Sequence, residues 1–222
     1  MLESEARTFV ERVALLPFGM CFRPLSDEHP ELDQPGAAAM RRANLVQYLV
    51  ERTRERPVVL AGEAMGYAGG RFSGIAFTAE RTLLEWGEPY VLTSLRPEGY
   101  KEMSGSIVHA LLGELGVEHR VLLWNTVPAH PHPHGRPLGN RAPSTRERLA
   151  GGAVLASLLE AVRPLAVVPV GRTAERTLAE AGVAALPSVR HPAQGGATRF
   201  REQAGAALRE LSLAPRGGTS NP

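Results

Sequence analysis

Four apolar segments of the chain have the length and composition of buried strands. Each one ends in a glycine, a proline or a polar residue, as strands commonly do where they enter loops. The segments are residues 57–62, 120–125, 164–171 and 183–192. Apolar residues also recur at helical spacing in three intervening stretches, residues 104–116, 145–162 and 173–182. The pattern therefore predicts strands that alternate with helices.

Such alternation predicts right-handed crossovers and a mostly parallel sheet that helices cover on both faces. We therefore expect an α/β fold of three layers, α/β/α, with a central, mostly parallel four-stranded sheet. Thr145 and Thr173 are candidate N-caps, and Gly182 is expected to close the last of these helices. Ligands of such sheets bind outside the carboxyl ends of the strands, so these ends are where a site is expected.

The residues before the first strand and after the last predicted element have a different character. Helical spacing covers residues 4–16 and 37–56, which makes 1–56 a helical N-terminal part. We find no internal repeat and no second core, so we expect a single domain over residues 1–213. Residues 214–222 are rich in Pro, Gly and Ser and are expected to be poorly ordered.

Composition narrows the class of protein. The chain has 222 residues, of which 43% are hydrophobic, and no apolar run approaches the roughly 18 residues of a membrane span. The N-terminus carries acidic residues where a signal peptide is basic, so we expect a cytoplasmic protein without a membrane partner. The single cysteine, Cys21, excludes an intramolecular disulfide and any metal site or cluster held by four thiolates of one chain.

Charge is distributed unevenly along the chain. Residues 1–119 contain 12 basic and 17 acidic side chains, whereas residues 120–222 contain 13 basic and 6 acidic ones. All basic residues except Lys101 are arginines, which suit bidentate contacts to phosphate. An arginine-rich face is also often plain solvated surface, so charge alone leaves nucleic-acid binding and a solvated surface equally open.

Three polar residues follow three of the predicted strands. Glu63 follows the first strand, Asn125 ends the second and His191 follows the fourth, each close to Gly or Pro or at a strand end. Taken singly, they could be a helix-start acid, a turn cap and a rim histidine. Because the carboxyl ends of parallel strands share one edge, a carboxylate, a carboxamide and an imidazole are expected to meet there and to form a functional pocket.

Other motifs fit less well. The stretch GEAMGYAGG at 62–70 lacks the Lys-Ser/Thr of a P-loop and the spacing of a dinucleotide fingerprint. The HPHPH stretch at 130–134 has prolines that hold it extended and no carboxylate or cysteine nearby, which disfavours a metal site. No serine lies in a GxSxG elbow, so the sequence does not favour a hydrolase triad.

Four segments, in this order, resemble the motifs of the uracil-DNA glycosylase superfamily, in particular a bacterial branch whose first motif reads GEAPG. GEAMGYAGGRFSGIAFTAER is similar to the water-activating motif and its loop, and VLLWN to the strand that ends in a uracil-reading Asn. NRAPSTRE, at 140–147, resembles an NRTPT segment, and RHPAQGG resembles the HPS motif that begins a DNA-penetrating loop. The resemblance spans roughly residues 57–205 and implies a uracil-DNA glycosylase-like fold.

The resemblance implies catalytic roles for Glu63 and His191. Glycosidic cleavage builds positive charge on the sugar and negative charge on the departing base, so Glu63 would serve the sugar or its water and His191 the base carbonyl. Phe77 would stack on a flipped base and Asn125 would pair with the uracil edge. The substrate-binding residues implied are Gly62, Ala64, Met65, Gly66, Tyr67, Phe77 and Asn125.

DNA binding is implied for the arginines near these motifs and for the turn after His191. The residues are Arg71, Asn140, Arg141, Ser144, Arg190, Pro192, Ala193, Gln194, Gly195, Gly196 and Arg199. Two alternatives stay open: the arginines could mark a solvated helix start, and Ser144 with Glu147 has the spacing of a capping box.

The chain also departs from the family pattern. Ala64 stands where relatives use Asp or Asn to orient water, Met65 replaces a proline, and Gly66 replaces the Tyr that excludes thymine. Cys21 alone cannot hold the iron-sulfur cluster frequent in the GEAPG branch, so no cofactor is expected.

The expected function is a monomeric DNA repair glycosylase acting on uracil or a related damaged base. Alternatives are a weak or inactive member that binds damaged DNA or a nucleobase, and a small-molecule nucleotide-binding protein.

Overall fold

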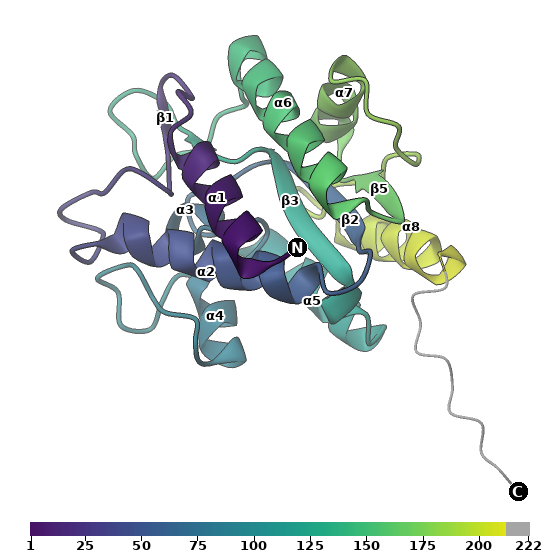
Figure 1. Cartoon of the computed structure of the whole chain (residues 1–222), viewed down its shortest axis with the longest axis horizontal. Coiled ribbons are helices and arrows are strands. Elements are labelled where there is room, and N and C mark those ends of the chain that lie inside the picture. The colour runs from purple at the N-terminus through teal and green to yellow at the C-terminus, as the bar shows by residue number, and fades with distance from the viewer. Residues whose placement is uncertain (212–222) are drawn as a thin grey trace, which may run out of the picture.

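The computed structural model describes residues 1–211 (Figure 1). The chain begins with α1 (Glu3–Ala14), β1 (Cys21–Phe22), α2 (Ala37–Arg52), β2 (Val58–Ala64), α3 (Gly70–Ser73), α4 (Glu80–Trp86) and α5 (Met103–Glu114). It continues with η1 (Glu118–Arg120), β3 (Val121–Val127), β4 (His130–Pro131), α6 (Thr145–Val162), β5 (Ala166–Pro169), α7 (Arg172–Glu180) and α8 (Ala197–Glu210). The predicted tail, 214–222, lies outside the described residues.

A parallel sheet with strand order β3-β2-β5 forms the centre of the fold. Val58 to Ala61 of β2 are fully buried, and every residue of β3 is buried. Such continuous apolar strands are typical of a parallel sheet with both faces covered. Helix α6 packs along β3, α7 packs on β2 and β5, and α1 packs on α2 (Figure 1). The α/β class and the mostly parallel sheet are therefore confirmed.

The predicted fourth strand is not confirmed. Within 183–192, only Val189 forms a bridge, a parallel one with Val170. The amide of Leu186 donates to the carbonyl of Val167, and that of Val189 donates to the carbonyl of Pro169. Pro187 and Pro169 have no N–H to contribute, so a continuous ladder cannot form. The segment nevertheless follows β5 and delivers His191 to the same edge of the sheet.

Helix positions follow from the apolar spacing, but their ends depend on local contacts. The predicted range 145–162 is confirmed residue for residue as α6. Its cap is Ser144 rather than Thr145: the Ser144 hydroxyl accepts from the Glu147 amide, and the Glu147 carboxylate accepts from the Ser144 amide at 2.7 Å. The capping box is thus confirmed, and the Thr145 cap was wrong.

Three helices were not predicted from the sequence, namely α3, α4 and α8. The cap of α7 is Gly171 rather than Thr173, and Gly182 follows that helix with a positive φ of 69°. Within the described part of the chain, no helix is both long and apolar enough to span a membrane.

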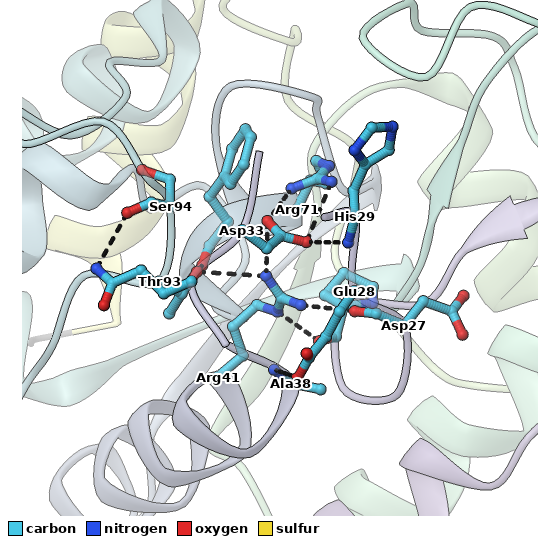
Figure 2. A network of polar contacts seen from close by, with 12 residues as sticks. Asp27, Glu28, His29, Asp33, Ala38, Arg41, Arg71, Thr93 and Ser94 are labelled. Atoms are coloured by element: carbon cyan, nitrogen blue, oxygen red, sulfur yellow. Dashed lines mark hydrogen bonds and ion pairs between the residues drawn. The ribbon is translucent and has the colours of Figure 1, made fainter. Parts of the chain in front are cut away.

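A buried cluster of ions joins α2 and α3 to the loop between β1 and α2 (Figure 2). The Asp33 carboxylate accepts from the Arg71 guanidinium at 2.7 Å and lies 3.3 Å from that of Arg41, and all three side chains are almost completely buried. Arg41 also donates to the carbonyl of Asp27 at 2.6 Å. Arg71 lies over the rings of Phe22 and Phe72, 4.1 and 4.0 Å from their centroids. One carboxylate thus balances two buried cations.

We expect Asp33→Asn to lower the free energy of unfolding by about 3–5 kcal/mol, because it leaves two buried guanidinium groups without their counter-charge. Urea denaturation followed by circular dichroism measures the change. The matched control is Glu3→Gln, which breaks the exposed Glu3–Arg7 pair and should cost less than about 1 kcal/mol. Equal small losses in both variants would contradict the role given to Asp33.

Candidate active site

A cavity of about 830 Å³ opens at the carboxyl ends of the strands. The three strand-end residues predicted to meet, Glu63, Asn125 and His191, all line it. Phe77 and Met65 line the same cavity from the loop that follows β2. The site is therefore located at the edge where parallel α/β sheets bind ligands.

Gly62 leaves the space in which Phe77 and Asn125 lie. It is paired with Asn125 in the register of β2 and β3. A Cβ atom at Gly62 would lie 2.4 Å from Cζ of Phe77 and 2.6 Å from Oδ1 of Asn125. Asn125 is 4% exposed, and its carboxamide makes no hydrogen bond to any residue of the described range 1–211. Its donors and its acceptor are therefore free for a ligand.

Phe77 is held in an unusual backbone conformation. Its φ is +53°, a value that a bulky residue rarely adopts and that marks stored strain. Its carbonyl oxygen packs against Gly105 of α5, where a Cβ atom would approach to 2.3 Å. Ser73 donates to the carbonyl of Thr78 at 2.6 Å and so closes the same loop. The ring centroids of Phe77 and His191 lie 6.0 Å apart.

The hydrogen bonds of His191 fix which ring nitrogen can donate. Its Nδ1 lies 3.1 Å from the amide nitrogen of Ala193, an N–H that needs an acceptor. The proton of the neutral ring is therefore on Nε2. Burial, and then the positive charge of Arg190, lower the pKa of His191 below its ordinary value. At neutral pH the ring is thus an uncharged donor through Nε2.

The turn after His191 is shaped by residues that tolerate a left-handed backbone. Gln194 and Gly195 have φ values of +52° and +73°, and both are exposed. A Cβ atom at Gly196 would lie 2.0 Å from the carbonyl oxygen of His191, so only glycine fits there. The Arg190 guanidinium donates a hydrogen bond to the carbonyl oxygen of His191 at 3.1 Å, and this contact stabilises the turn.

Glu63 is half-buried at the end of β2. The Thr126 hydroxyl donates to its backbone carbonyl at 2.9 Å, which fixes the main chain. Within residues 1–211, no hydrogen bond or ion pair engages its carboxylate. The side chain is therefore free to accept a proton from a water molecule or to face a cation in the cavity.

The HPHPH stretch at 130–134 anchors the segment between β2 and α4, residues 65–79, which we call the motif loop. His130 is fully buried, with Nδ1 3.0 Å from the carbonyl oxygen of Met65 and Nε2 3.2 Å from that of Pro137. Burial lowers its pKa. Met65 in turn donates its amide to Ala129. No group of three metal-binding side chains occurs in the part of the chain that the structure describes.

Several residues expected to contact substrate or DNA have other roles. Arg71 is fully buried on Asp33, so its assignment to DNA binding was wrong. Tyr67 is 39% exposed and does not line the cavity, and its backbone amide donates to Oδ1 of Asn140 at 3.0 Å. Ser144 caps α6. Sequence patterns could not show the pairings of Arg71 and Tyr67, since Asp33 and Asn140 lie far along the chain, whereas the spacing of Ser144 and Glu147 already indicated the cap.

Arg141 lines the cavity, but its charge is paired. Both of its terminal nitrogens donate to the Glu147 carboxylate, at 2.8 and 2.7 Å. The pair lowers the pKa of Glu147 to about 2. Arg190 and Arg199 are exposed and line the cavity, as do Ala193 and Gln194 of the turn, whereas Pro192, Gly195 and Gly196 belong to the turn without lining it.

Glu102 was missed by sequence reasoning. It is the N-cap residue of α5 and lines the cavity. Burial raises its pKa to about 7. In the sequence it resembles any acidic residue at a helix start, and the only local signal is the nearby glycine, Gly105. Arg172, Ser104 and Gln203 also line the cavity without having been predicted.

Comparison with known proteins adds the family. The crystal structure of wild-type Pedobacter heparinus SMUG2 matches with a TM-score of 0.62 and 13% identity, over 93% of this chain and 97% of that one. At this identity the likeness concerns the fold alone. No curated protein sequence matches the chain. The family model of the uracil DNA glycosylase superfamily matches residues 51–211, which include the whole sheet and every strand-end residue of the cavity. The chain therefore belongs to the uracil DNA glycosylase superfamily.

Proposed function

We propose that this protein is a monofunctional DNA glycosylase that takes uracil, or a related damaged base, out of the DNA stack and hydrolyses its N-glycosidic bond. The observation that carries the proposal is one cavity lined by a free carboxamide, an aromatic ring, a neutral imidazole donor and a free carboxylate. Its volume of about 830 Å³ is in the range of small-ligand sites. An extruded nucleotide needs such a pocket because its target atom is out of reach inside a duplex.

The base would be recognised by Phe77 and Asn125. An aromatic ring stacks on any base and contributes about 1–3 kcal/mol. The carboxamide of Asn125 offers one acceptor for the N3–H of uracil and one donor for its O4. Cytosine presents the opposite pattern at that edge, with an amino donor and a ring acceptor. The free amide therefore favours uracil over cytosine.

Cleavage would use Glu63 and His191 at opposite ends of the broken bond. As the bond between C1′ and the base nitrogen breaks, its electron pair stays on the base and positive charge develops on the sugar. The Nε2–H of His191 would donate to the base carbonyl that takes up the negative charge. Glu63 would face the sugar, accept a proton from water and direct the water oxygen to C1′. The products are the free base and an abasic site.

DNA would be held by the exposed turn after His191 together with Arg190 and Arg199, which belong to the basic half of the chain.

We assign the protein to a GEAPG-like branch without an iron-sulfur cluster, acting as a monomer in the cytoplasm. Cys21 fits this assignment, because burial first, and then Glu147, raise the pKa of its thiol to about 12. Such a thiol is unreactive at neutral pH.

Single-turnover cleavage of labelled oligonucleotides tests the proposal. We expect the wild-type protein to cleave at uracil opposite G, opposite A and unpaired, and Glu63→Gln to slow cleavage at least about 100-fold, as loss of a general base does. DNA affinity should change little. Tight binding by a wild type that cleaves nothing would favour the alternative of a recognition module. Equal losses of affinity and rate in Glu63→Gln would point to misfolding.

His191→Ala removes the donor to the departing base and should lower the cleavage rate about 100- to 1,000-fold. A second readout comes from ¹⁵N NMR of the wild-type imidazole. We expect Nε2 protonated and Nδ1 unprotonated at pH 7, because Nδ1 accepts from Ala193 and burial lowers the pKa. A charged ring at pH 7 would contradict the role of a neutral donor.

Asn125→Ala should relax the choice of base. The variant loses the paired donor and acceptor, so the ratio of the rates on uracil and cytosine should fall by about 10-fold or more. Gln47→Ala serves as the control, because it removes a carboxamide of α2 that does not line the cavity and should leave that ratio unchanged. An unchanged ratio in Asn125→Ala would show that another group reads the base.

A further inference from the structure

Glu102 lies in a slot formed by three glycines. A Cβ atom at Gly66 would lie 2.6 Å from its Oε1, and one at Gly69 would lie 2.2 Å from its Oε2. A third, at Gly105, would lie 3.3 Å from Oε2. Any side chain at the first two positions would displace the carboxyl group, so the motif loop and α5 together leave room for Glu102 and for little else.

The carboxyl group in this slot has an unmet hydrogen bond. Oε2 is buried and has no partner among residues 1–211. No ion pair within that range involves Glu102 either, although most buried carboxylates have one. A Cβ at Gly105 would also lie 2.3 Å from the carbonyl oxygen of Phe77, so this acceptor borders the same slot. Residues 1–211 therefore supply no hydrogen-bond partner to Oε2.

The surroundings favour the uncharged form of the acid. Burial raises the pKa of Glu102 to about 7. A neutral carboxylic acid can donate one hydrogen bond and accept others, as an amide does, whereas a carboxylate only accepts. Glu102 lines the same cavity as Phe77 and Asn125.

We propose that Glu102 is a further base-reading residue, whose neutral carboxyl group donates a hydrogen bond to an oxygen substituent of the bound base. This inference rests on the proposed function and deepens it. The pocket would accept bases that present an oxygen to Glu102 and reject those that present an amino group. When the acid ionises, its donor is lost and the preference for oxygen-bearing bases weakens.

Other ionisable groups around the cavity can be separated from Glu102. The other ionisable side chains that line the cavity are Glu63 of β2, Arg141 before α6, Arg172 of α7, Arg190 and His191 after β5, and Arg199 of α8. The arginines stay charged at all working pH values. The pKa of His191 lies below its ordinary value, so this ring titrates on the acid side. Arg71, in the motif loop, is paired with Asp33 and does not line the cavity. A transition near pH 7 that the wild type shows and Glu102→Gln lacks is thus assigned to Glu102.

The test uses a labelled DNA that carries one uncleavable 2′-fluoro-2′-deoxyuridine. Its affinity for the protein is measured by fluorescence polarisation and compared with that of the same DNA with cytosine or thymine at that position. Affinities are measured between about pH 5.5 and 8.5, across the ordinary ranges of Glu and His. The wild type should prefer uracil over cytosine, and this preference should decline as the pH rises through 7. Glu102→Gln keeps a donor and an acceptor without a titrating proton, so it should retain the preference at every pH. Glu102→Ala should reduce it about 10-fold, the effect of one buried hydrogen bond.

Glu85→Gln, an exposed acid of α4, is the matched control and should behave as the wild type. Thermal unfolding confirms that each variant folds. A Glu102→Ala variant with wild-type preference, or a Glu102→Gln variant with the wild-type decline above pH 7, would overturn the inference. Cleavage of uracil DNA is measured in parallel. Selective binding that depends on Glu102 without any cleavage would refute the proposed function and leave this inference standing.

Discussion

The site depends on the absence of a side chain at Gly62. The register of β2 and β3 pairs this glycine with Asn125, and the loop after β2 returns Phe77 to the same point. A methyl group there would overlap both side chains, so the Asn125 amide and the Phe77 ring can share one pocket only while residue 62 has no Cβ. The carboxyl ends of the parallel strands form the edge that bears the site, and the missing side chain of Gly62 leaves space there for the cavity.

The loop around the cavity is strained and is held from several sides. Phe77 has a positive φ, and its carbonyl oxygen rests against Gly105. His130 holds the carbonyl oxygen of Met65, and the buried ions around Asp33 fix α3 through Arg71 (Figure 2). These anchors come from β4 and from the loop before α2, and His130, Asp33 and Arg71 do not line the cavity.

Much of the fold could be predicted because apolar runs record burial directly. Three of four strands and the helix 145–162 follow from the pattern alone. The fourth strand failed because pairing needs backbone N–H groups, and Pro187 and Pro169 lack them. The meeting of Glu63, Asn125 and His191 was predictable because strand direction sends three sequence positions to one edge. Arg71 was misjudged because its partner, Asp33, is remote in the sequence.

The sequence by itself determined the fold class, the edge of the sheet that bears the site and the residue types that meet there, because periodicity and strand ends are local properties of a chain. Only the tertiary structure decided the state of each group. It placed Glu102 in a slot of glycines, gave His191 its tautomer through Ala193 and turned Arg71 away from the surface. Burial and partners set charge and hydrogen bonding, and both depend on segments that only folding brings together.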